Sequence, residues 1–362
     1  MILFLIVLIV VVAAYQNWAR KNALSGVAFQ SKCTQNLVEA GEEFQLVSTL
    51  SNHSRRIIPF LRVEETFPKG TVLTYGKGQQ RTDLAGTVKH HYSTYLMPKS
   101  QLTRKITLSI PKRGLYYFRG AQISGGDFLG LWEERGNFTA FEEVAVYPKA
   151  IPIPHLEDAF GGFLGEVSVR RFMMEDPVLT VGIRDYTGRE PLNQISWKHS
   201  ARRGELQVKQ FDYTVEPMVS ILLDVSTNSS DNNLLEKCYS LTRSICQQLE
   251  QKGIAYDLIT NTVPDSQLSK NGEYLAQGLG KSHFKKVLEL LGKASYYSGD
   301  TFEETVQRLV KKQARSRSAI IVTPQRDESK SHVVRQELVG GSLIILYGED
   351  CHDIPIEPET DL

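Results

Sequence analysis

The sequence predicts a multidomain protein with a membrane helix at its N-terminus, an all-β domain and a C-terminal α/β domain. The chain begins with an apolar run, and short β-type segments separated by turn residues follow up to about residue 150. After residue 217, apolar strands alternate with amphipathic helices. The length of 362 residues suits two or three domains of about 100–200 residues each.

The apolar run is predicted to be a retained membrane anchor over residues 1–21. Its core, residues 2–15, is shorter than the roughly 20 residues that a spanning helix needs, and an extension past Trp18 gives a marginal span. A cleaved signal peptide is the alternative, but no positive segment precedes the run. Because Arg20 and Lys21 follow it, we expect a single-pass protein of the cell membrane with its soluble domains in the cytoplasm.

Residues 22–150 are predicted to form an immunoglobulin-like β-sandwich. Segments such as 43–48 and 143–147 alternate in polarity or are rich in β-branched and aromatic residues, and turn signals such as 68–70 separate them. Several short strands at this spacing are typical of a sandwich. Residues 151–216 follow as a linker and a polar, aromatic and basic block.

Residues 217–348 are predicted to form an α/β domain whose sheet is mostly parallel. Residues 219–223 and 318–323 are apolar strands, and residues 234–251 have the apolar spacing of an amphipathic helix. Fully apolar strands between helices favour a parallel sheet that is covered on both faces. The acidic residues 349–362 are predicted to be a flexible tail.

Composition and motifs narrow the possible functions. A net charge of +1 gives no global basic field, so no nucleic-acid partner is expected. The sequence has no GxSxG elbow, P-loop, HExxH motif or dinucleotide-binding glycine fingerprint. We therefore predict that the chain is not an enzyme. An uncharacterised hydrolase or transferase of envelope metabolism, and a purely structural envelope scaffold, are the alternatives.

Oxygen-bearing side chains after the first apolar strand predict a cation site. Asp224, Ser226 and Asn228 follow that strand, and Thr301 stands at the start of a predicted helix later in the same domain. Carboxylate, hydroxyl and amide oxygens are the ligands that a hard cation such as Mg²⁺ or Mn²⁺ takes. The alternative is a metal-free site, in which Asp224 and Ser226 cap the following loop and Thr301 caps its helix.

The block before this strand is a second candidate site, for recognition of a partner or an anion. It combines aromatic and charged side chains, a mixture that suits phosphate or carboxylate recognition. Its candidate residues are Arg184, Asp185, Tyr186, Trp197, Lys198 and Arg202. The alternative is that Tyr186 and Trp197 pack in a core while the cations form a solvated face.

The motifs of this block resemble a bacterial membrane-associated family known as domain of unknown function number fifty-eight. The matching segments are 184–186, 195–198, 200–202 and 204–209, with 112–116, 127–131 and 146–148 upstream. The Asp-x-Ser sequence at Asp224 is similar to the cation motif of the von Willebrand factor A fold, which the resemblance implies for the C-terminal domain. In that fold a Thr and an Asp from two further loops complete the cation site, and the resemblance implies Thr301 and Asp327 for these positions. The chain departs from the family's pattern at three points. Asn228 stands where the cation motif has Ser, and Glu190 stands where the family has a pair of acidic residues. The family has two N-terminal membrane segments, whereas this chain is predicted to have one.

The resemblance implies a function as well as a fold. Members of that family are associated with MoxR-type AAA+ ATPases. The resemblance therefore implies a membrane-anchored cytoplasmic scaffold that acts as an adaptor for such an ATPase, using a degenerate metal-ion-dependent adhesion site.

Overall fold

The computed structural model describes eleven segments of the chain: residues 24–75, 79–82, 86–126, 133–151, 180–188, 190–211, 218–227, 232–264, 272–312, 318–337 and 343–351. The predicted membrane anchor, Asn228 and residues 352–362 of the acidic tail lie outside them. Within the chain, contacts define two units. The first comprises Met1–Lys149 with Leu288–Ala294, and the second comprises Ala150–Val287 with Ser295–Leu362.

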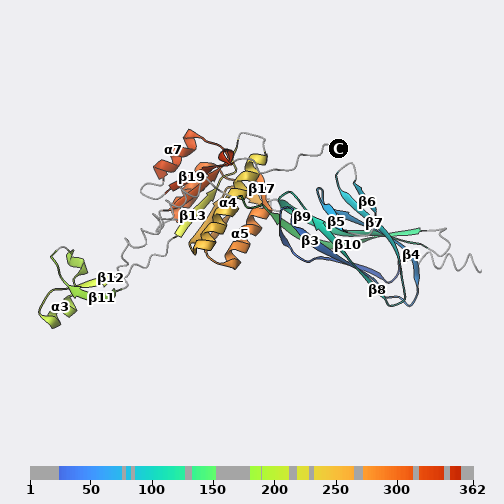
Figure 1. The fold of residues 1–362 in the computed structure, drawn as a ribbon, viewed down its shortest axis with the longest axis horizontal. Helices are drawn as coiled ribbons and strands as arrows, with labels where there is room; N and C mark the ends of the chain where they lie inside the picture. The colour runs from blue at the N-terminus through green and yellow to red at the C-terminus, as the bar shows by residue number, and fades with distance from the viewer. Residues whose placement is uncertain are drawn as a thin grey trace, which may run out of the picture. The chain divides into compact units, whose positions relative to one another are not determined.

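The first unit contains a β-sandwich (Figure 1). One sheet has the order β1 (Val27–Cys33), β3 (Glu43–Asn52), β8 (Gln101–Ser109), β5 (Val72–Tyr75). The other has the order β2 (Leu37–Glu39), β10 (Glu133–Tyr147), β9 (Gly114–Gly126), β4 (Ile58–Phe67), β7 (Val88–Leu96), β6 (Gln79–Thr82). Neighbouring strands are antiparallel except β2 and β10. Alternate residues of β3 and β4 are buried, as expected for strands with one face in a core.

A polar cluster lies inside this apolar core. Ser48 of β3 donates to Oε1 of Glu65 on β4 at 2.5 Å, so the hydrogen bond joins the two sheets. The other carboxylate oxygen of Glu65 lies 3.3 Å from Nδ1 of His90 on β7. All three side chains are at most 2% exposed. A buried carboxyl group needs such partners, because it has lost its hydrogen bonds to water. Burial without replacement partners costs roughly several kcal/mol of stability.

The second unit is built on a five-stranded mixed sheet. Its order is β16 (Tyr274–Gly278), β14 (Ala255–Thr260), β13 (Met218–Leu223), β18 (Ala319–Thr323), β19 (Leu343–Tyr347). β16 is antiparallel to β14, and the other neighbours pair in parallel. A separate pair joins β15 (Thr262–Pro264) to β17 (Ala294–Ser298).

Helices cover the central strands of this sheet. They are α4 (Asn232–Lys252), α6 (Phe302–Lys312) and α7 (Glu328–Glu337). A further helix, α5 (Lys281–Lys293), begins in this unit, and its residues from Leu288 onward belong to the first. In α4 the buried apolar residues recur at helical spacing, from Leu235 through Leu241 and Ile245 to Leu249. Phe302 and Val306 of α6 pack with Leu222 of β13 in one buried cluster. β13 is buried from Val219 onward, as a strand covered on both faces is.

The block from residue 180 to 211 forms a small structure of its own. β11 (Thr180–Asp185) and β12 (Gln207–Phe211) pair antiparallel. Between them lie the short helices η1 (Leu192–Gln194) and α3 (Trp197–Arg203). Gly204 ends α3 in the left-handed conformation at φ 79°, which glycine adopts without steric cost.

As a whole, the predicted fold class of a membrane helix, an immunoglobulin-like sandwich and a mostly parallel von Willebrand factor A-like domain is wrong for this chain, although its β-sandwich component is present and the predicted membrane helix lies outside the described residues. Strands provide most of the regular structure in the described residues, which include the hairpin of β11 and β12 and the pair of β15 and β17. Among those residues no helix is long and apolar enough to cross a membrane. Periodicity identifies strands and helices singly, whereas their assembly into sheets depends on long-range pairing that periodicity does not encode.

Candidate functional site

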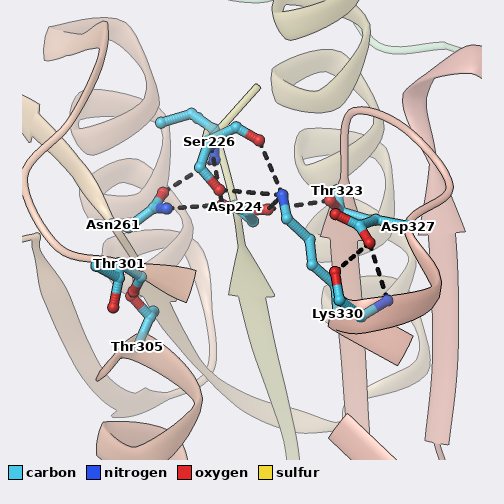
Figure 2. Close-up of polar contacts among 10 residues, drawn as sticks. Asp224, Ser226, Asn261, Thr301, Thr305, Thr323, Asp327 and Lys330 are labelled. Atoms are coloured by element: carbon cyan, nitrogen blue, oxygen red, sulfur yellow. Dashed lines mark hydrogen bonds and ion pairs between the residues drawn. The ribbon is translucent and has the colours of Figure 1, made fainter. Parts of the chain in front are cut away.

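Three polar residues of the second unit meet where parallel strands end (Figure 2). Asp224 follows β13, Asn261 follows β14 and Thr323 ends β18. The carboxyl ends of parallel neighbours lie at the same edge of a sheet, which is where α/β sheets place ligand sites. Asp224 and Asn261 are completely buried, and Thr323 is 2% exposed. The edge therefore holds a buried carboxylate whose partners come from separate parts of the chain.

Each carboxylate oxygen of Asp224 accepts hydrogen bonds. Oδ1 accepts from Nδ2 of Asn261 at 2.6 Å, and from the backbone N–H and the hydroxyl of Ser226 at 2.9 and 2.5 Å. Oδ2 accepts from the hydroxyl of Thr323 at 3.0 Å. Asn261 is itself oriented by a bond from the backbone N–H of Val225 to its Oδ1, at 2.9 Å. These bonds compensate for the lost hydration of a buried carboxylate.

A lysine supplies the positive charge opposite Asp224. The Nζ atom of Lys330, from the first turn of α7, lies 2.7 Å from Oδ2 of Asp224. It also donates to the carbonyl oxygen of Ser226 at 2.9 Å and to its hydroxyl at 3.0 Å. Nζ lies 5.3 Å from the ring centre of Phe302, within the range of a cation–π contact. The buried carboxylate and the partly buried lysine therefore form a fully hydrogen-bonded ion pair.

Thr301 and Asp327, the predicted metal ligands from the two later loops, do not join this cluster. Thr301 caps α6: its hydroxyl accepts from the N–H of Glu304 at 3.2 Å, and Glu304 accepts from the N–H of Thr301 at 3.0 Å. This reciprocal pair is a capping box. Asp327 accepts from the N–H of Ser329 at 2.9 Å and from its hydroxyl, at the start of α7. Figure 2 shows Thr301 and Asp327 on opposite sides of Asp224, without a bond from either to its carboxylate.

The bonds of Asp327 also affect its ionisation. Hydrogen bonds from the hydroxyl of Ser329, and then from its backbone N–H, lower the pKa of Asp327 below its usual value. A charged carboxylate in the first turn of a helix is favoured by the helix dipole. Asp327 therefore has a structural role at the start of α7.

The residues at Asp224 do not fit a divalent cation in this conformation. A carboxylate offers about four lone-pair positions, and those of Asp224 already face five donors. The ammonium of Lys330 lies where a cation would contact Oδ2 of Asp224 and the oxygens of Ser226. Across the part of the chain that is described, no group of three or more His, Cys, Asp or Glu side chains could hold a metal ion.

A small cavity lies beside Lys330. Its volume is about 10 Å³, and Phe302, Ile321, Val334 and Ile345 are among its lining residues. Such a volume holds about one water molecule. The hydrolase or transferase alternative requires a substrate pocket at the Asp224 edge, and this cavity is too small to serve as one.

The second candidate site, in the block of residues 180–211, has a hydrogen-bonded interior. Gln207 is 1% exposed and donates through Nε2 to Oδ1 of Asp185 at 2.6 Å. Its backbone N–H donates to the hydroxyl of Ser200 at 2.9 Å, and its carbonyl accepts from the N–H of Ser196 at 2.8 Å. Arg203 donates to Oε1 of Gln207 at 3.2 Å. Gln207 is therefore the buried centre of these bonds, and Asp185, whose side chain is 75% exposed, ties it to β11 from the surface.

Arg184 is also engaged inside the block. Its Nη1 lies 2.5 Å from Oε1 of Glu190. Glu190 accepts further bonds from the hydroxyl of Thr187 at 2.7 Å and from its N–H at 3.0 Å. The Thr187 hydroxyl first, and then the Arg184 guanidinium, lower the pKa of Glu190 to about 2.

The order of these causes gives a testable prediction. We expect Thr187→Ala to raise the pKa of Glu190 more than Arg184→Met does, because the Thr187 hydroxyl is the larger influence. A lowered pKa contributes stability that is present above the ordinary value of 4.5 and is lost as the pH falls toward about 2. Nuclear magnetic resonance titration of the Glu190 carboxyl carbon measures both shifts. A pKa near the ordinary value in the unmodified chain, or the reverse order in the variants, would contradict the assignment.

The aromatic and basic residues of α3 point outward. The side chain of Trp197 is 63% exposed, and that of Leu192 in η1 is 70% exposed. Lys198 and Arg202 are also exposed, and Tyr186 is half-buried. The buried apolar positions of the block belong instead to Ile195 and Val208. The alternative in which Trp197 is a core anchor therefore does not describe this block.

Sequence reasoning missed three residues that surround Asp224. Asn261 and Thr323 each stand at the end of an apolar strand, a signal that could have been used. Lys330 lies 106 positions from Asp224 in a short helix, and nothing in its local sequence distinguishes it from a surface lysine.

Comparisons with known proteins show only distant similarities. No model of a known protein family matches the chain, so the resemblance to domain of unknown function number fifty-eight stays a prediction. The chain is 23% identical over 324 residues to the uncharacterized protein YeaD of Bacillus subtilis, an alignment that covers 86% of this chain and 73% of YeaD.

Two solved β domains each match a third of the chain. One is the CARDB domain of a Pyrococcus furiosus protein, solved in complex with di-metal ions. Its sequence is 14% identical to this chain, the match covers 86% of the CARDB domain, and the TM-score is 0.23. The other is a cohesin module of a Clostridium perfringens glycoside hydrolase. Its sequence is 11% identical to this chain, the match covers 97% of the module, and the TM-score is 0.26. At these TM-scores, neither domain's binding properties transfer to this chain.

Proposed function

We propose that this chain is a membrane-anchored cytoplasmic interaction protein, without catalytic activity, that acts as an adaptor for a MoxR-type AAA+ ATPase. The observation that carries the proposal is the exposure of Trp197 on α3, beside the exposed cations Lys198 and Arg202. Tryptophan and arginine are enriched among the residues that dominate binding energy at protein interfaces. A largely exposed tryptophan in an ordered helix therefore favours a contact surface.

The internal bonding of the block supports its role as a rigid contact module. Asp185 and Gln207 connect the two strands to each other and to Arg203, without using Lys198 or Arg202. A module that is ordered before binding loses less conformational entropy when it binds. The exposed cations would complement an acidic surface on the partner, which gives specificity and faster association.

The Asp224 edge supports a non-enzymatic role. A catalytic carboxyl group needs access to its substrate, and Asp224 is completely buried with both oxygens hydrogen-bonded. The adjoining cavity has room for about one water molecule. We assign this edge a structural role within the adaptor.

Membrane attachment is the part of the proposal that rests on residues 1–21. Their apolar run gives a marginal span, and Arg20 and Lys21 follow it. A single anchor would hold the contact module close to the cytoplasmic face of the membrane. This arrangement suits an adaptor that recruits a soluble ATPase.

Co-purification tests the adaptor role. The full chain, in detergent, is incubated with the purified MoxR-type ATPase of the same organism, and the bound fraction is measured. We expect the double variant Trp197→Ala, Arg202→Ala to lower affinity at least about tenfold, because hot-spot residues contribute about 2 kcal/mol or more each.

Tyr297→Ala is the matched control. Tyr297 is 77% exposed on β17, so its removal deletes an exposed aromatic side chain outside the block. Equal loss of affinity in both variants would contradict the assignment of the contact to α3. Failure of the unmodified chain to bind the ATPase would overturn the adaptor proposal.

A further inference from the structure

The ammonium of Lys330 has every donor position filled by the Asp224 edge. A lysine ammonium carries three N–H donors. Three oxygens receive them: Oδ2 of Asp224 at 2.7 Å, the carbonyl of Ser226 at 2.9 Å and the hydroxyl of Ser226 at 3.0 Å. Figure 2 shows the side chain extending from α7 to these oxygens. The lysine is therefore bound as a ligand is bound, by converging groups of the protein.

The oxygens around this ammonium are of the kind that hold a divalent cation. A carboxylate, a hydroxyl and a backbone carbonyl are hard oxygen donors, and Mg²⁺ is commonly held by one or two carboxylates with water filling the remaining positions. The hydroxyl of Thr323, which now donates to Oδ2 of Asp224, is a fourth oxygen at the same place. The amide of Asn261 holds the other carboxylate oxygen in position.

We infer that Lys330 is a tethered substitute for a divalent cation. Its ammonium fills the cation position beside Asp224, so the edge of the sheet is complete without metal. Removal of the ammonium would leave a latent site for Mg²⁺ or Mn²⁺, made by Asp224, Ser226 and Thr323. The chain thus carries its own cation where a related arrangement of oxygens would recruit one from solution.

The ammonium and a divalent cation exclude each other at this position. A magnesium ion would lie roughly 2.1 Å from a ligand oxygen. The ammonium lies 2.7 Å from Oδ2 of Asp224, and the lysine side chain is only 19% exposed. Two like charges bound to one carboxylate oxygen in a partly buried site repel each other strongly, because little solvent screens them.

The covalent tether has a further consequence. Lys330 belongs to α7, so its bonds fasten that helix to the loop after β13. Phe302 of α6 lies against the same ammonium. A free metal ion would satisfy Asp224 without holding α7. Lysine therefore makes the packing of α7 independent of metal concentration.

Manganese binding to the full chain tests the inference. Electron paramagnetic resonance of free Mn²⁺ measures binding by the unmodified protein, Lys330→Met, Lys330→Ala and the double variant Asp224→Asn, Lys330→Met. We expect both single variants to bind Mn²⁺ at least about tenfold more tightly than the unmodified protein, and the double variant to lose that gain. Lys285→Met, which removes an exposed lysine of α5, is the matched control and should resemble the unmodified chain.

Thermal unfolding gives an independent reading of the same variants. A ligand that binds only the folded state raises the unfolding midpoint. Mn²⁺ should therefore raise the midpoint of the Lys330 variants and leave that of the unmodified protein unchanged. The inference is overturned if the unmodified protein binds Mn²⁺ as tightly as Lys330→Met. It is also overturned if both Lys330 variants neither bind Mn²⁺ nor regain stability from it.

Discussion

Asp224→Ala is expected to destabilise the second unit by about 3–5 kcal/mol. The substitution leaves the ammonium of Lys330 without its counter-ion, in a side chain that is only 19% exposed. It also leaves the Asn261 amide and the Thr323 hydroxyl without their acceptor. Breaking a buried pair from one side costs more than the pair contributes, because the remaining charge stays buried. Urea denaturation followed by circular dichroism measures the change in the free energy of unfolding.

The control for this prediction is Asp327→Ala. Asp327 caps α7 through Ser329 and does not contact Asp224, so its loss should cost about 1 kcal/mol, as for other N-caps. The double variant Asp224→Ala, Lys330→Met should be more stable than Asp224→Ala alone, because it removes the uncompensated charge. If Asp224→Ala and Asp327→Ala lowered the free energy of unfolding equally, the ion pair would contribute no more to stability than a helix cap.

Glu65→Ala is expected to destabilise the β-sandwich by about 3 kcal/mol. Its carboxyl group links Ser48 of one sheet to His90 of the other, and all three side chains are buried. Without Glu65, the Ser48 hydroxyl and Nδ1 of His90 lose their partner in the core, and each buried unsatisfied group costs about 1–3 kcal/mol. The shortened side chain also leaves a void. Chemical denaturation of the full chain, with hydrogen exchange of β3 and β4 amides, locates the loss in this unit.

The adjacent residue supplies a matched control. Glu64 points to the other face of β4, where it pairs with Lys89 at 2.9 Å and has a side chain that is 24% exposed. Surface ion pairs contribute about 0–1 kcal/mol, so Glu64→Ala should have a small effect. Both variants replace Glu by Ala and remove one negative charge, but only Glu65 is fully buried. The comparison therefore separates the effect of burial from the effect of the lost charge. If Glu64→Ala proved as destabilising as Glu65→Ala, the bridge between the sheets would not be the cause.

Several elements could be predicted from local pattern alone. The alternation at 43–48 lies within β3, the apolar run 219–223 is β13 apart from Met218, and the periodic segment 234–251 lies within α4. Each of these segments has a regular pattern of apolar residues, because one face or both faces of the element are buried in a core. By contrast, β11, β12 and α3 were not predicted. Their 32-residue block (180–211) has few apolar residues and is held by side-chain hydrogen bonds, which leave no period in the sequence.

The predicted cation site shows the same limit of local sequence patterns. The sequence singled out Asp224 and Ser226, because a carboxylate and a hydroxyl after an apolar strand are a local signal, and they are indeed bonded to each other. Thr301 and Asp327 gave a similar local signal, but the same residue types also cap helices, and here they do so. Local residue types alone do not distinguish a cap from a cation ligand.

By itself, the sequence determined the segments of strong hydrophobic period, such as β3, β13 and α4, and that Asp224 is the central residue of its loop. Only the tertiary structure decided what Asp224 faces. Asn261, Thr323 and Lys330 lie 37, 99 and 106 positions away along the chain and meet Asp224 because parallel strands bring their ends to one edge. The identity of the cation at that edge, an ammonium on α7, follows from this long-range packing. Strand pairing and helix docking are non-local, so the composition of the loop alone could not reveal that identity.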